Sequence, residues 1–107
     1  MAREAAERFL RSRGHPVTSA RNGEEALRAA TREAPDVLVC DWSLGPGLDG
    51  VEVARNLQRR FNVFVIFVTA HPLHELRATT GDLRVASYFR KPVSLPVLAD
   101  TVGRLTQ

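Results

Sequence analysis

The sequence predicts an α/β domain in which helices cover both faces of a parallel sheet. Two apolar runs, at residues 37–40 and 63–68, are short, unbroken and bounded by turn signals, which is typical of strands buried on both faces. Segments with helical spacing of apolar residues separate the candidate strands. This regular alternation indicates right-handed βαβ units.

The first half of the chain is expected to hold two helices and two strands. Residues 2–13 place apolar side chains on one helical face, and a Gly-His-Pro sequence ends that helix. Residues 17–20 form a short candidate strand. Asn22 is expected to cap the second helix, with Glu25 in capping-box position, and the helix ends before the next proline. Residues 37–41 are expected to form a central strand.

The second half repeats the alternation after a Gly- and Pro-rich loop. Its strongest strand is β-branched and aromatic throughout and apolar on both faces. Altogether we expect four strands and about five helices. The elements expected here are a helix at 51–60, a strand at 62–69, a helix at 72–80, a strand at 85–90 and a final helix from residue 94.

Composition places the chain among ordinary globular domains. It has 107 residues, 44% hydrophobic and 25% charged, with a net charge of +3, which suits one domain. Arginines near the N-terminus favour a solvated helix face over a nucleic-acid site. The single cysteine, Cys40, cannot form an internal disulfide, and no apolar run could span a membrane. We therefore expect a cytoplasmic protein that binds neither nucleic acid nor membrane.

Three polar residues fall at the carboxyl ends of three successive predicted strands: Asp41, Thr69 and Lys91. In an open parallel sheet these ends meet at one crevice. A carboxylate there can attack a phosphoryl group while a hydroxyl and an ammonium bind its oxygens. Lys91 is also the one lysine among 15 basic residues, which favours a site that needs a compact charge on a flexible stem.

Over essentially its whole length the sequence resembles the receiver domain of two-component response regulators. The motifs that carry the resemblance are Asp41 at the end of an apolar strand, the Gly-Pro-Gly-Leu-Asp-Gly loop, Val68-Thr69-Ala70, and the run from Tyr88 to Pro92. The resemblance implies a flavodoxin-like three-layer αβα fold. It also implies a bacterial phosphorelay module rather than an enzyme, with at most weak autophosphorylation and autodephosphorylation.

The resemblance assigns a role to each matching residue. Asp41 corresponds to the phosphoacceptor, which takes its phosphoryl group from a histidine kinase or a phosphotransfer protein. Thr69 corresponds to the switch hydroxyl, Lys91 to the phosphoryl-binding ammonium and Tyr88 to the switch aromatic. Pro92 suggests a cis Lys91–Pro92 peptide. His71 stands where the family varies a residue at the entrance, although it and His74 also fit solvent-exposed positions at a helix start.

The chain departs from the family pattern at its beginning. Family members open with a strand that ends in two acids, and these acids supply much of a Mg²⁺ site. In this chain Asp41 and the backbone carbonyl of Ser43 remain in position. Because Mg²⁺ normally draws on carboxylates for charge, we expect weak or absent binding. We expect residues 1–107 to be one receiver-like domain, N-terminally truncated and without an output domain.

The absent strand would lie between residues 17–20 and 37–41. Its loss leaves a gap of roughly 10 Å, or two strand spacings, with unpaired backbone on both sides. The two sides could pair directly, a second chain could fill the gap, or the first helix could cover it. We expect a dimer or a rearranged N-terminal half.

Three functional hypotheses remain open. The first is a phosphorylated receiver that signals through protein–protein contact. The second is a pseudo-receiver that acts as an interaction or dimerisation module without phosphorylation, which the missing acids favour. The third, a phosphatase with Asp41 as nucleophile, lacks a general acid in the adjacent Trp42-Ser43.

Overall fold

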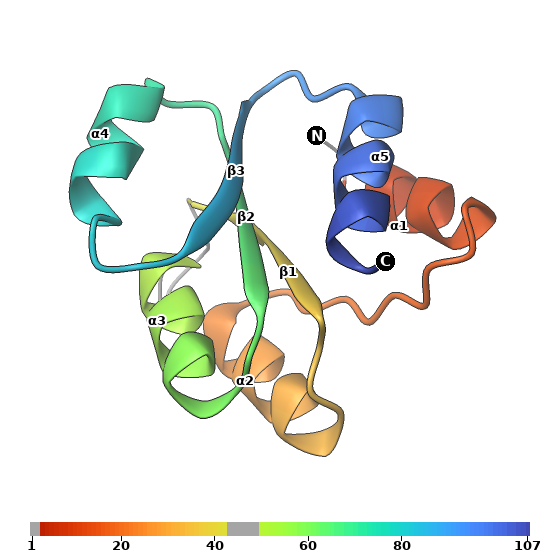
Figure 1. Cartoon of the computed structure of the whole chain (residues 1–107), viewed down its shortest axis with the longest axis horizontal. Helices are drawn as coiled ribbons and strands as arrows, with labels where there is room; N and C mark the ends of the chain where they lie inside the picture. The colour runs from red at the N-terminus through yellow and green to blue at the C-terminus, as the bar shows by residue number, and fades with distance from the viewer. Residues whose placement is uncertain (1–2, 43–49) are drawn as a thin grey trace.

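The computed structural model describes residues 3–42 and 50–107 (Figure 1). From residue 37 onward strands and helices alternate as the sequence predicts, whereas in the described residues before it two helices follow one another. The helices are α1 (Arg3–Ser12), α2 (Gly23–Arg32), α3 (Gly50–Arg60), α4 (Leu73–Thr79) and α5 (Leu95–Leu105), and the strands are β1 (Val37–Asp41), β2 (Phe64–Thr69) and β3 (Val85–Arg90).

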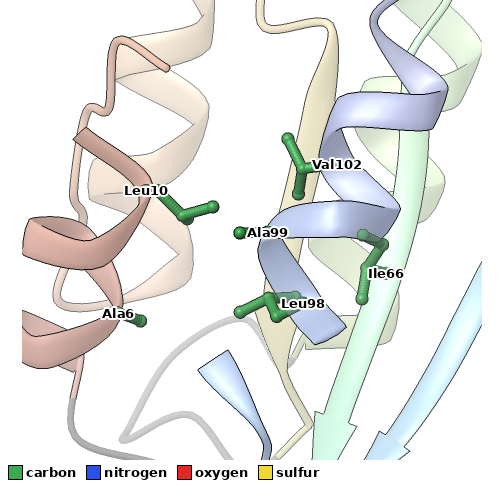
Figure 2. Close-up of a cluster of buried hydrophobic side chains, with 6 residues drawn as sticks. All are labelled: Ala6, Leu10, Ile66, Leu98, Ala99 and Val102. Carbon is green, nitrogen blue, oxygen red and sulfur yellow. The ribbon is translucent and has the colours of Figure 1, made fainter. Parts of the chain in front are cut away.

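The three strands form one parallel sheet in the order β1-β2-β3. Strand β2 is central, and its side chains alternate between the two faces. Ile66 packs with residues of α1 and α5, whereas Val65 and Phe67 pack with residues of α3 and α4. Figure 2 shows Ile66 beside the α5 side chains of the first cluster, with Ala6 and Leu10 of α1 beyond them.

The three-layer αβα arrangement expected from the sequence is therefore confirmed. Helices α1 and α5 lie on one face of the sheet, and α3 and α4 lie on the other (Figure 1). Helix α2 packs on α3 through a third cluster that includes Ala30, Val53 and Leu57. Among the described residues no helix is long and apolar enough to cross a membrane.

The helix caps agree with the sequence in their main features. The side chain of Asn22 accepts a hydrogen bond from the backbone N–H of Glu25 at 2.9 Å, so Asn22 caps α2 as expected. The Glu25 carboxylate accepts from the backbone N–H of Arg21 at 3.3 Å, one residue before the donor of a standard capping box. Ser94 caps α5 by accepting from Val97.

The prediction of a strand at residues 17–20 is wrong. This segment has no strand assignment, so the described part of the chain has three strands instead of four. Two of its carbonyls accept hydrogen bonds from arginine side chains of α1: Val17 from Arg11 at 2.8 Å and Ala20 from Arg3 at 3.1 Å. A strand exists through pairing with a neighbour, and local β-propensity without a neighbour does not produce one.

The possibility that residues 17–20 pair directly with the strand at 37–41 is also wrong. Within the described residues β1 pairs with β2 alone. As a result Val37, Leu38 and Val39 are only half-buried, although the sequence predicts burial on both faces. Strand β2 begins at Phe64, two residues later than expected, and Phe64 itself is 46% exposed.

Candidate functional site

The parallel register brings the ends of the three strands to one edge of the sheet. Asp41 lies beside Val68, and Thr69 lies beside Arg90. The backbone N–H of Lys91 donates to the carbonyl of Thr69 at 2.8 Å, which extends the ladder one residue beyond β3. The sequence predicts that these carboxyl ends meet at one edge, and the register agrees with that prediction.

Asp41 and Lys91 are in direct contact. The Lys91 Nζ donates to Asp41 Oδ2 at 2.7 Å, and the two side chains keep 27% and 32% of their exposure respectively. The Lys91–Pro92 peptide is cis, as the sequence suggests. An anion and a cation therefore meet at the sheet edge, and both remain in contact with water.

Thr69 lies at the same edge, but its hydroxyl is engaged elsewhere. The residue is 1% exposed, and its Oγ1 accepts a hydrogen bond from the backbone N–H of His71 at 2.9 Å. This contact fixes the turn that follows β2. In the described structure the Thr69 hydroxyl makes no hydrogen bond to Asp41 or Lys91, so of the three predicted side chains only two touch.

Two aromatic rings follow the ends of β1 and β2. The ring of Trp42, which follows Asp41, meets the ring of His71 edge to face, with centroids 5.5 Å apart and planes at 82°. The contact links the segments that leave β1 and β2. Trp42 was not among the predicted site residues, although its adjacency to Asp41 is a signal that could have identified it.

Tyr88 lies on the face of the sheet that α3 and α4 cover, opposite α1 and α5. Its ring stacks on Phe67 with centroids 6.1 Å apart, and the Arg77 guanidinium lies 5.2 Å from its centroid. Its hydroxyl shares a 2.6 Å hydrogen bond with Oγ1 of Thr80, a residue that is 1% exposed. Nothing in the sequence singles out Thr80, because a threonine after a helix has many equivalent explanations.

The backbone beneath Asp41 is closely packed. A Cβ on Gly50 would lie 2.6 Å from the Asp41 carbonyl oxygen and 2.6 Å from Cys40 Sγ. The Cys40 thiol donates to the Gly50 carbonyl at 3.5 Å, and the residue is buried, as expected for a small hydrophobic residue. The start of α3 is therefore pressed against the end of β1, which requires glycine.

The described residues do not make up a magnesium site. They contain no group of three or more histidine, cysteine, aspartate or glutamate side chains that could hold a metal. Asp41 is already engaged by Lys91, and Ser43, whose carbonyl was the other expected ligand, lies outside the described residues. Mg²⁺ favours several oxygen ligands that carry negative charge, and one paired carboxylate does not provide them.

Comparison with known proteins identifies the family of this arrangement. The family model described as the response regulator receiver domain matches residues 1–103. Sporulation initiation phosphotransferase F of Bacillus subtilis is 30% identical over 92 residues, which are 85% of this chain and 73% of that protein. An uncharacterized response regulatory protein of Vibrio cholerae is 37% identical over 92 residues, but the chain spans only 34% of its length.

Solved structures show the same fold. The N-terminal domain of a response regulator from Carboxydothermus hydrogenoformans superposes with a TM-score of 0.85 at 27% identity, covering 95% of this chain and 82% of that one. The Francisella response regulator 1452 receiver domain gives 0.84 at 28% identity, covering 95% and 84%. A further sequence relative, the alkaline phosphatase synthesis transcriptional regulatory protein PhoP of Bacillus subtilis, is 37% identical over 86 residues, which are 79% of this chain and 35% of that protein.

Proposed function

The chain belongs to the response regulator receiver family, and from that premise we propose that Asp41 accepts a phosphoryl group from a histidine kinase or a phosphotransfer protein. The observation that carries the proposal is the 2.7 Å contact between Asp41 and Lys91. Two residues from different strands supply a nucleophilic oxygen and a cation at one water-accessible point. This is the minimum that an aspartyl phosphate site needs from its own side chains.

In the proposed reaction an Asp41 carboxylate oxygen attacks phosphorus, and the P–N bond of the donor phosphohistidine breaks. The electron pair of that bond stays on the imidazole nitrogen, which then takes a proton from solvent. As charge spreads over the transferred oxygens, the Lys91 ammonium pairs with one of them instead of with Asp41 Oδ2. Mg²⁺, if bound, would neutralise more of that charge.

We assign Thr69 and Tyr88 to the response that follows phosphorylation. The Thr69 hydroxyl lies at the end of β2 and accepts a hydrogen bond from the backbone N–H of His71, in the turn that follows the strand. Its own O–H can therefore donate to a phosphoryl oxygen while it still accepts from His71. Movement of this turn changes the start of α4. We propose that the surface formed by α4, β3 and α5 carries the signal through contact with another protein.

Intact mass after treatment with acetyl phosphate and Mg²⁺ tests the assignment. The expected result is one added phosphoryl group in the wild type and none in Asp41→Asn. The matched control is Asp36→Asn, because Asp36 is an exposed aspartate just before the opposite end of β1 and should leave labelling unchanged. Labelling that survives Asp41→Asn would contradict the proposal.

The alternative is a pseudo-receiver that uses the fold as an interaction module. The observation that favours it is that the described part of the site offers one carboxylate, already paired with Lys91, and no three-residue metal cluster. This alternative predicts no added mass in a protein that circular dichroism shows to be folded. The same experiment therefore separates the two functions.

A further inference from the structure

A second group of basic side chains lies where the C-terminal ends of α1 and α5 meet. Arg13 and His15 follow α1, and Arg104 lies in the last turn of α5. Together with Asp100 and Gly103 of α5 they line a surface hollow of about 510 Å³. Figure 1 shows α5 beside α1, with the C-terminal end of α5 directed away from the carboxyl end of β3. The hollow therefore lies apart from the edge of the sheet that holds the candidate site.

Arg13 is held in place by two contacts that leave most of its donors free. Its guanidinium carbon lies 5.0 Å from the centroid of the Phe9 ring, and its Nη1 lies 3.2 Å from Oδ1 of Asp100. A guanidinium has five N–H donors in a planar fork, and within the described part of the chain this one makes no other hydrogen bond. The Arg13 side chain is 44% exposed, so a ligand in the hollow can reach its remaining donors.

Arg104 and His15 have unused donors as well. The Nη2 of Arg104 donates to Oγ1 of Thr101 at 3.3 Å, and no carboxylate side chain in the described residues pairs with it. The backbone N–H of His15 donates to the Leu10 carbonyl at 3.1 Å, which fixes this half-buried residue beside the hollow. Its imidazole has no hydrogen-bond partner among the described residues. The carboxylate of Asp100 therefore faces more donors than it can engage.

Gly103 leaves space in the hollow. A Cβ at this position would meet no atom within 4 Å, so no close contact demands glycine. Glycine is unfavourable in the interior of a helix, yet it stands within α5 on the wall of the hollow. A longer side chain at this position would occupy part of the space that a ligand needs.

We propose that this hollow binds a small phosphate dianion, either free or as the monoester of a small molecule. The planar fork of arginine matches the geometry of phosphate oxygens, and one phosphate has enough oxygens to accept from both helix ends at once. Asp100 carries a single negative charge and contacts Arg13, so it does not compensate Arg104. Because exposed ion pairs contribute little to stability, a dianion can displace the Asp100 carboxylate from Arg13.

The inferred site does not depend on the proposed phosphorylation of Asp41. Lys91, the partner of Asp41, precedes the N-cap of α5, which is Ser94. Arg104 follows that cap by ten residues, which is roughly 15 Å along a helix that rises 1.5 Å per residue. A phosphate held by Arg104 is therefore too far away to be the group that Asp41 would accept.

A small anion fits the hollow better than a nucleic-acid backbone does. A backbone of that kind is followed by a row of free basic side chains. Two other arginines of α1, Arg3 and Arg11, already donate to backbone carbonyls in the segment at residues 17–20. The free donors are therefore confined to the hollow and do not extend along the helix.

The test is a titration of the full 107-residue chain, followed by proton–nitrogen correlation NMR at pH 7 and constant ionic strength. The probes are inorganic phosphate and glucose 6-phosphate, and the controls are sodium chloride and glucose. We expect saturable shift changes at the amides of His15, Gly103 and Arg104 with the phosphates and none with the controls. The phosphate that binds more tightly identifies whether the group is free or esterified. Changes at Asp41 report on the candidate site and not on this one.

Substitutions at the hollow make the result specific. Arg104→Gln and Gly103→Leu should each weaken binding by about tenfold or more, because one loses a charge-assisted hydrogen bond and the other fills the space. Arg28→Gln, at an exposed arginine of α2, is the matched control and should leave affinity unchanged. Asp100→Asn should strengthen binding by roughly twofold to fivefold, because it removes a competing surface charge.

Circular dichroism confirms that each variant folds, and a gain of affinity in Asp100→Asn cannot come from a loss of structure. Three results would overturn the proposal: no saturable change at the hollow in the wild type, equal affinity in Arg104→Gln and Arg28→Gln, or weaker binding in Asp100→Asn.

Discussion

Lys91 and Asp41 are separated by 50 positions in the chain and joined by one hydrogen bond. Because both side chains keep about a third of their exposure, water screens the pair, and such pairs contribute roughly 1 kcal/mol or less to stability. The contact is therefore better explained by the chemistry of the site than by the needs of the fold.

Lys91→Met separates these two explanations. We expect the free energy of unfolding in urea to change by about 1 kcal/mol or less, because Asp41 remains accessible to water. Labelling by acetyl phosphate should fall by about two orders of magnitude, as is typical when a charge-stabilising donor is removed. A large loss of stability with unchanged labelling would show that the pair is structural.

The hydroxyl pair of Tyr88 and Thr80 is tested by a double-mutant cycle. Tyr88→Phe and Thr80→Val each remove one side of the 2.6 Å hydrogen bond. The Thr80 hydroxyl also donates to the Leu76 carbonyl at 3.0 Å, so only the cycle isolates the energy of the Tyr88–Thr80 pair. We expect a coupling of about 1 kcal/mol in urea unfolding; additive single effects would contradict the bond.

The sequence predicts where a site residue lies when the residue stands at the end of a strand. It does not predict which hydrogen-bond partner the side chain has. Asp41 and Lys91 follow apolar runs, and parallel strands bring such ends together whatever the intervening sequence. The partner of Thr69 is His71, and the partner of Tyr88 is Thr80. Those choices depend on the exact course of the turns after β2 and α4, which no periodicity encodes.

At the scale of elements, the end of β1 and the start of α3 are in close contact at Gly50. Gly50→Ala would place a Cβ 2.6 Å from backbone and sulfur atoms, closer than real contacts allow. The helix or the strand end must shift, and overpacking of this kind costs about 1–3 kcal/mol. Urea unfolding measures the loss, and Gly103→Ala on α5, where a Cβ meets nothing within 4 Å, is the control.

A second link between elements depends on pH. Arg55 of α3 donates two hydrogen bonds to Asp82, at 2.7 and 3.1 Å, in the turn before β3. The hydrogen bond from Arg55 holds the pKa of Asp82 below its ordinary value of 3.8. A lowered carboxylate pKa contributes stability that is present above the ordinary pKa and is lost as pH falls through the folded-state value.

Asp82→Asn should therefore lower the melting temperature slightly at pH 7, with the difference from wild type shrinking as pH falls below 3.8. The effect is small because the pair is exposed to solvent. Thermal unfolding followed by circular dichroism from pH 7 to pH 2 measures it. A difference that grows at low pH would show that Asp82 acts in some other way.

A strand could be predicted from its own residues only where the rest of the sheet supplies it with a partner strand. Residues 62–69 are predicted to form a buried strand, and 64–69 form one, because β2 has neighbours on both sides and helices on both faces. Residues 17–20 are predicted to form a short strand and form none. The difference lies in a partner strand, which is a property of the whole sheet and not of the segment.

At the scale of the whole molecule, a cavity beside β1 is large for a domain of this size. The cavity of about 530 Å³ is lined by side chains of α1, α2, α3 and α5 and is partly open to solvent. Apolar atoms added to its walls would therefore be removed from water.

Filling part of the cavity from inside should stabilise the chain. Ala26→Leu adds apolar atoms on α2 at a half-buried position that lines the cavity and borders the cluster around Leu57. We expect an increase of about 0.5–2 kcal/mol in the free energy of unfolding, as other cavity-filling substitutions give. The control Arg28→Leu makes the same residue on the exposed face of the same helix and should change stability by less than about 0.5 kcal/mol. If Ala26→Leu destabilises while Arg28→Leu does not, the space has already closed in solution, and the helix layers have moved together along the free edge of β1.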